Sequence, residues 1–130
     1  LAEAREYYYE ARRILATTHV IDHMIYADSS ITQQASVMAF LSALKAIDCY
    51  ALARKYARVP VSIEEYMQVV AEMPQPLGRV VQMRLTVVYQ NLHLLAYQAG
   101  GVEVEAIKSG FRRAKEIVDA IENHMMRKNS

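Results

Sequence analysis

The chain has 130 residues, with 15 lysines and arginines against 14 aspartates and glutamates, so its formal net charge is +1. This length predicts one domain over residues 1–130, and the balanced charge argues against nucleic acid as a partner. The single cysteine, Cys49, excludes an intramolecular disulfide, and no apolar run reaches the length of a membrane span. We therefore expect a cytoplasmic protein without a membrane segment.

The predicted elements are helices separated by capping and turn residues, and no strand signal is evident. The first helix is predicted from Ala2 to Tyr26, where apolar residues recur at spacings of three and four. Ser30, followed three residues later by Gln33, predicts the start of a second helix. That helix is expected to end near Ala57, because the residue before Pro60 avoids helical angles.

Two further helices follow in the middle of the chain. Ser62 and Glu65 form another capping box, which predicts a short helix over residues 63–73. Pro76 is tolerated in the first turn of the next helix, which is predicted to run to about Ala99. The Gly100-Gly101 pair then predicts a left-handed end to that helix.

The last helix is predicted from Val104 to Met126, where apolar residues again recur at spacings of three and four. Within it, Gly110 stands beside the large Phe111 and is expected to let two helix backbones approach closely. Long helices of similar length with short connections predict an all-α fold, an antiparallel four-helix bundle. The short helix is then an extra element in the central connection.

Asp48 is a carboxylate within the apolar pattern of the second helix. The face expected to carry the core also holds these apolar residues: Val37, Leu41, Leu44 and Ala51. Because an uncompensated buried charge is costly, Asp48 is expected to be paired, protonated or functional. Arg84 and Asn91 lie in or beside the core face of the fourth helix. The predicted partner of Asp48 is therefore Arg84, or else His93 from the flank of that helix. A polar layer that fixes helix register is favoured over a pocket floor.

Tyr89, His93 and Tyr97 follow one another on a flank of the fourth predicted helix. Their spacing predicts an aromatic wall that contains a titratable group. Such a wall suits a small ligand or a partner, although a seam between two helices is the more common role.

His19 and His23 have the spacing of a metal-binding pair on a helix, with Asp22 beside them. Zinc needs at least a third protein ligand, and spacing identifies none, so two exposed histidines and no metal are expected. The sequence contains no glycine-rich phosphate loop, nucleophile elbow or Cys-x-x-Cys pair. We therefore expect neither catalytic residues nor a cofactor, and these expectations argue against an enzyme.

Basic residues cluster at Arg12-Arg13, at Arg54-Lys55 with Arg58, and at Arg112-Arg113. Acidic residues are scattered between these clusters along the chain. We interpret the clusters as solvated helix faces in preference to a nucleic-acid-binding stripe.

Three segments carry a resemblance to a known family: residues 43–50, residues 93–97 before the glycine pair, and residues 107–111. They resemble short bacterial helical bundles that are classed as a domain of unknown function. More distantly, the chain is similar to HEPN-type bundles, which include nucleotide-binding partners of nucleotidyltransferases and toxin ribonucleases. The ribonucleases carry an arginine shortly followed by a histidine near the start of the last helix. That order is absent here, so the resemblance implies a fold and no catalytic residues.

Two classes of function follow from these patterns. The first is a non-enzymatic interaction protein that self-associates, most simply as a homodimer, or binds another protein. It rests on apolar residues outside the expected core faces, namely Tyr8, Leu15, Tyr26, Val80, Met83, Val87 and Leu94. The alternative is a bundle that binds a small ligand or nucleotide through Asp48, Arg84 and the Tyr89, His93 and Tyr97 face.

Overall fold

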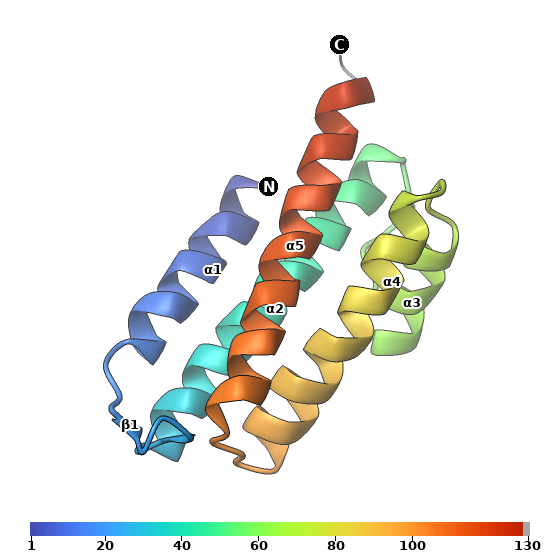
Figure 1. Ribbon diagram of the computed structural model, residues 1–130. Coiled ribbons are helices and arrows are strands. Elements are labelled where there is room, and N and C mark those ends of the chain that lie inside the picture. Colours follow the sequence, from blue (N-terminus) through green and yellow to red (C-terminus); the bar gives the residue numbers. More distant parts are fainter. Residues whose placement is uncertain (129–130) are drawn as a thin grey trace.

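The computed structural model describes residues 1–128 and is mostly helical (Figure 1). This confirms the predicted all-α class. The elements, in chain order, are α1 (Ala2–Leu15), β1 (Val20–Ile21), β2 (Ile25–Tyr26), α2 (Ser29–Ala53), α3 (Ile63–Ala71), α4 (Leu77–Val88), the π-helix η1 (Tyr89–Gln98) and α5 (Val104–Lys128).

The first predicted helix is too long, because residues 20–26 form a β-hairpin that the sequence analysis missed. Ile21 and Ile25 are cross-strand partners in this hairpin. Their spacing of four fits one face of a helix, but it also fits two strands joined by a three-residue connection. Asp22 and His23 adopt positive φ values of 52° and 61° in that connection. The strand signal in this segment is the β-branched pair Val20 and Ile21.

Side-chain caps explain where the next helices begin. Asp28 Oδ1 accepts hydrogen bonds from the N–H groups of Ser30 and Ile31, so α2 begins at Ser29. The predicted cap at Ser30 is wrong, because the residue that caps the helix lies two positions earlier. The predicted cap of α3 is confirmed, since Ser62 Oγ accepts a hydrogen bond from the N–H of Glu65 at 3.2 Å. The fourth predicted helix is continuous, but it changes from α4 to η1 at residue 89. Gly100, with φ of 71°, confirms the predicted left-handed end.

α2 packs against α1, α5 and η1, and its buried face consists largely of small residues. Seven of them are fully buried: Ala35, Ser36, Ala39, Ser42, Ala43, Ala46 and Ala51. The predicted core face is therefore wrong, because Val37, Leu41 and Leu44 are only half-buried. Because other helices pack against α2 on several sides, only small side chains fit where two helices meet. The large side chains of α2 therefore lie at the edges of these contacts.

Gly110 of α5 makes room for a large side chain of η1, whereas the sequence predicted a close approach of two helix backbones. A Cβ atom at this position would lie 2.6 Å from Cγ of the fully buried Leu92. The close contact is thus with a side chain and not with the backbone of the neighbouring helix. Any larger residue would have to displace Leu92 from the core.

α2 is the one helix, among the described residues, whose length and hydropathy would allow it to span a membrane. More than half of its most apolar window is buried inside the protein. The central helix of a compact fold meets the same criteria, because it is apolar on several faces.

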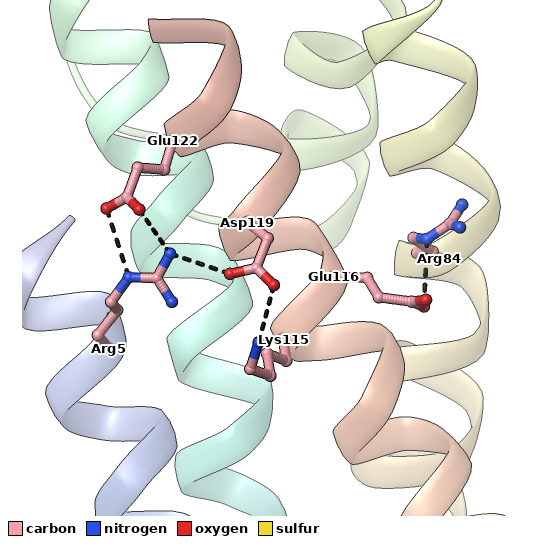
Figure 2. A network of polar contacts seen from close by, with 6 residues as sticks. All are labelled: Arg5, Arg84, Lys115, Glu116, Asp119 and Glu122. Atoms are coloured by element: carbon pink, nitrogen blue, oxygen red, sulfur yellow. Dashed lines mark hydrogen bonds and ion pairs between the residues drawn. The ribbon is translucent and has the colours of Figure 1, made fainter. Parts of the chain in front are cut away.

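α1 is joined to α5 by an ion-pair cluster that we call the Arg5 clamp, formed by Arg5, Lys115, Asp119 and Glu122 (Figure 2). Arg5 Nη2 lies 2.7 Å from Glu122 Oε1 and 2.9 Å from Asp119 Oδ1. Lys115 Nζ contacts the other oxygen of Asp119 at 2.9 Å. The hydrogen bond from Arg5 holds the pKa of Glu122 below its usual range. Burial raises the pKa of Asp119, but the hydrogen bonds from Lys115 and Arg5 outweigh it and leave that pKa lowered.

Replacing Arg5 by methionine keeps the apolar stem and removes the clamp. The free energy of unfolding is expected to fall by about 0.5 to 1 kcal/mol at neutral pH, measured by urea denaturation. Carboxyl groups with lowered pKa values stabilise the fold above their ordinary pKa and lose this effect as the pH falls through the folded-state pKa. The difference should therefore shrink below about pH 4.

Arg13→Met is the matched control, because Arg13 pairs with Glu10 inside α1 and links no other helix. An equal loss in both variants would show that the clamp contributes nothing specific to helix packing.

Candidate functional site

A groove of about 420 Å³ lies between α1 and α5, and the hairpin lines its end. Its residues come from α1, from the segment that joins α1 to β1, from both strands, and from the first half of α5. The hairpin is fixed there by backbone hydrogen bonds from Tyr26 N–H to Val102 and from Val104 N–H to Met24, at 2.8 and 2.9 Å. The volume falls within the range of small-molecule sites, about 300 to 1,000 Å³.

The floor of the groove is aromatic. Tyr8, Tyr26 and Phe111 are buried, with exposed fractions of 7%, 4% and 5%. The rings of Tyr8 and Phe111 pack at a tilt of 56° with their centroids 6.2 Å apart. The apolar part of a ligand would have a large contact area on such a floor and could pack against the faces or edges of its rings.

The rim of the groove is cationic, with Arg12, Lys108 and Arg112 exposed around the aromatic floor. Within the part of the chain that the structure describes, none of the three forms an ion pair, and no carboxylate lines the groove. Their sequence neighbours behave differently, since Arg13 pairs with Glu10 and Arg113 with Glu116. Each Arg-Arg pair therefore holds one neutralised guanidinium and one that is open to a ligand.

The two tyrosines of the floor also supply polar groups. Burial raises the pKa of Tyr8, against the opposing charge of Arg12, and burial together with Glu105 raises the pKa of Tyr26. Both hydroxyls thus stay protonated at neutral pH and can donate hydrogen bonds. Neither has a hydrogen-bond partner among residues 1–128. The charged and hydroxyl groups at the groove therefore suit an electron-rich, anionic ligand.

This site was not identified from the sequence, although part of its signal was present. The basic clusters containing Arg12 and Arg112 are typical of solvated helix faces when they are considered in the sequence alone. They lie far apart in the chain, and only the packing of α1 and α5 around the hairpin brings both arginines to one groove.

Asp48 does not have the predicted partners. Its Oδ1 accepts a hydrogen bond from the hydroxyl of Tyr66 at 2.8 Å, which joins α2 to α3. Burial raises the pKa of Asp48, and the hydrogen bond from Tyr66 and the charge of Lys45 offset this only in part. Asp48 is half-buried beside the core face of α2. Because its hydrogen-bond partner is Tyr66, the predicted pairing with Arg84 or His93 is wrong.

Arg84 and Asn91 instead connect α4 and η1 to α5. Arg84 Nε lies 3.2 Å from Glu116 Oε1 (Figure 2). The same oxygen of Glu116 also accepts a hydrogen bond from Arg113. The contact between Arg84 and Glu116 is an ion pair by distance, although the Nε–H group of Arg84 does not point along a hydrogen bond. Asn91 Nδ2 donates to the backbone oxygen of Ala106 at 3.0 Å. The predicted polar residues are thus distributed over separate seams and do not form one site.

Tyr89, His93 and Tyr97 do stack along η1. The ring of His93 lies 5.2 Å from Tyr89 and 5.9 Å from Tyr97, with interplanar angles of 20° and 24°. Phe40 of α2 packs against His93 at 5.0 Å, a neighbour that the sequence analysis did not identify. The wall therefore lies along the seam between α2 and η1.

His19 and His23 lie outside the helices, which removes the basis for a helical metal pair. His19 precedes β1 and His23 occupies the hairpin connection, and both are exposed. The described residues hold no cluster of three or more metal-ligating side chains.

Asp48→Asn is expected to leave the free energy of unfolding at neutral pH unchanged or raised by up to about 1 kcal/mol. A carboxyl group whose folded pKa is raised favours the fold below its ordinary pKa, and this contribution is lost as the pH rises through the folded pKa. Asparagine cannot ionise, yet it still accepts the hydrogen bond from Tyr66. Urea denaturation between about pH 3 and 7 measures the difference.

Tyr66→Phe is the complementary variant, since it leaves the carboxylate without its hydroxyl. It is expected to lower stability at neutral pH by about 1 kcal/mol. A large loss for Asp48→Asn at neutral pH would instead mean that the charge itself stabilises the fold.

Comparison with known proteins places the chain in a family. A family model described as a domain of unknown function (DUF5618) matches residues 1–123. A solved structure of a protein of unknown function from Dyadobacter fermentans is 28% identical, with a TM-score of 0.77, and the match covers 95% of this chain and 94% of that one. No protein with a curated description matches the chain. The similarity to HEPN-type bundles stays a prediction. The match over residues 1–123 shows that the chain belongs to the DUF5618 family, as the first resemblance predicted.

Proposed function

We propose that the protein is a non-enzymatic binding protein whose groove between α1 and α5 holds a small molecule with an anionic group and an apolar body. The observation that carries this proposal is the arrangement of unpaired cations, Arg12, Lys108 and Arg112, above a buried aromatic floor. Three like charges that form no ion pair repel one another, so an anion that bridges them gains interaction energy that the free protein lacks.

The same observations favour this groove over the residues predicted from the sequence. Asp48 and Arg84 are each engaged by another element, and the aromatic wall on η1 is covered on one side by Phe40. In the groove, by contrast, charged and hydroxyl groups stand unengaged beside apolar surface. This combination is typical of ligand sites.

We also infer that α1, α2, α4 with η1, and α5 form the predicted antiparallel four-helix bundle, with α3 in the connection. The packing of α2 on α1, α5 and η1, together with that of α4 on α5, supports this arrangement. In such a bundle the hairpin replaces the end of the first helix and so opens the groove at one end.

The fluorescent dye 8-anilinonaphthalene-1-sulfonate, an aromatic anion, is a suitable first probe of the groove. One dye per chain is expected to bind, and the double variant Arg12→Gln with Arg112→Gln should weaken binding about tenfold or more. This magnitude follows because a hydrogen bond to a charged group contributes about 1.5 to 3 kcal/mol. A fluorescence titration measures the dissociation constant.

The matched control is Lys55→Gln with Arg79→Gln, which removes two exposed cations that form no ion pair among the described residues and lie outside the groove. Its affinity for the dye should equal that of the unaltered protein. Equal weakening in the two double variants, or dye binding without saturation, would contradict the proposal.

Self-association as a homodimer is a second candidate, favoured by the outer face of the hairpin. Val20 and its partner Tyr26 line the groove, so Ile21 and Ile25 face away from it, because side chains alternate along a strand. These two residues are 45% and 38% exposed, and Met24 beside them is 70% exposed. Tyr8 and Tyr26, which the sequence analysis assigned to a partner surface, are buried within the chain instead.

Sedimentation equilibrium tests the dimer at micromolar concentration. The double variant Ile21→Thr with Ile25→Thr keeps β-branched residues in the strands and is expected to sediment as a monomer. Val61→Thr, at an exposed apolar position away from the hairpin, should leave the dimer intact. A strict monomer for the unaltered chain would exclude this candidate and leave the ligand-binding proposal unaffected.

A further inference from the structure

We infer that the anionic group recognised by the groove is a phosphate monoester carried on an aromatic ring. This inference rests on the proposed function and narrows its ligand class. The groove's charge, its hydroxyl donors and its aromatic floor each support it independently.

The charge of the groove matches a dianion better than a monoanion. Arg12, Lys108 and Arg112 bring three positive charges to its rim. Lys115, one turn further along α5, is tied to Asp119 in the Arg5 clamp, so the unpaired charge is concentrated beside the hairpin. A phosphate monoester carries about −1.5 to −2 charges at pH 7, whereas a carboxylate carries one. The phosphate therefore offsets more of the repulsion among the three cations.

The hydrogen-bonding groups also match a phosphate. Both arginines present planar forks of N–H groups, and the Tyr8 and Tyr26 hydroxyls add donors from the floor. A phosphate monoester has three terminal oxygens directed away from its ester bond, and each can accept more than one hydrogen bond. A carboxylate has only two coplanar oxygens, so it can use fewer of these donors at once.

The aromatic floor of the groove indicates which group carries the phosphate. The tilted rings of Tyr8 and Phe111 offer a face and an edge against which another ring can pack. The groove, at about 420 Å³, has room for a ring system as well as the phosphate. An aromatic phosphate would therefore contact the cationic rim and the apolar floor at the same time.

The test compares ligands that share one ring and differ only in the anionic group. The probes are 1-naphthyl phosphate, 1-naphthoate and naphthalene-1-sulfonate, with inorganic phosphate as the ring-free probe. Isothermal titration calorimetry on the full chain at about pH 7.5 is expected to give the phosphate ester about tenfold higher affinity than either monoanion. Inorganic phosphate should bind more weakly than the ester, because it lacks the ring.

Each outcome separates this inference from the proposed function. Equal affinity for the phosphate ester, carboxylate and sulfonate would overturn the phosphate assignment and leave an anion-binding groove. Equal affinity for the ester and inorganic phosphate would overturn the role of the aromatic floor. Failure of all three naphthyl probes to bind would overturn the inference together with the proposed function.

The pH dependence gives a second readout. The second pKa of a phosphate ester is about 6, so lowering the pH from about 7.5 to 5 should weaken the naphthyl phosphate several-fold. Naphthalene-1-sulfonate keeps one charge over this range and corrects for titration of the protein itself. A parallel change for both probes would overturn the inference.

Tyr26→Phe removes one hydroxyl donor without removing the ring from the core. It is expected to weaken the phosphate ester several-fold and to change sulfonate binding less. Arg112→Gln should weaken both, and Arg79→Gln, outside the groove, should weaken neither. Melting curves establish that each variant is folded. Unchanged binding of the ester by Tyr26→Phe and Arg112→Gln would contradict the inference.

Discussion

Three helical segments pack closely on α2, and the positions of the remaining elements follow from this packing. The buried face of α2 is built from alanine and serine, so α1, α5 and η1 can all approach it closely. Because α1 packs mainly on α2, its contact with α5 is limited, and the Arg5 clamp supplies much of the polar link between them (Figures 1 and 2). The groove forms beside the hairpin, where this link is absent.

The groove has its charge because each helix places its basic residues on two faces. Adjacent residues on a helix point about 100° apart, so each Arg-Arg pair directs one side chain towards an acidic neighbour and the other towards the groove. Arg13 and Arg113 are neutralised in this way, while Arg12 and Arg112 are not. The nearly balanced charge of the whole chain therefore conceals a local excess of positive charge.

Much of the fold was predictable from the sequence, because caps and spacing are local. The cap at Ser62, the stop at Gly100 and the start of the last helix at Val104 were all predicted correctly. The hairpin was missed because the spacing of Ile21 and Ile25 satisfies two geometries, and local spacing does not distinguish them. Asp48 was correctly identified as a carboxylate in need of a partner, but Tyr66 comes from the short α3, which the sequence analysis assigned only to a connection.

Local sequence is sufficient to predict the all-α class, most of the helix starts and the aromatic stack along η1, because these depend on residues within a few turns of one another. Tertiary packing is needed to establish which face of α2 is buried, which residue pairs with Asp48, and where the three cations come together. α2 is apolar on more than one face, so its spacing does not specify a unique core side. Likewise, Arg12 and Arg112 belong to helices at opposite ends of the chain, and only the packing of those helices with the hairpin creates the groove that they share.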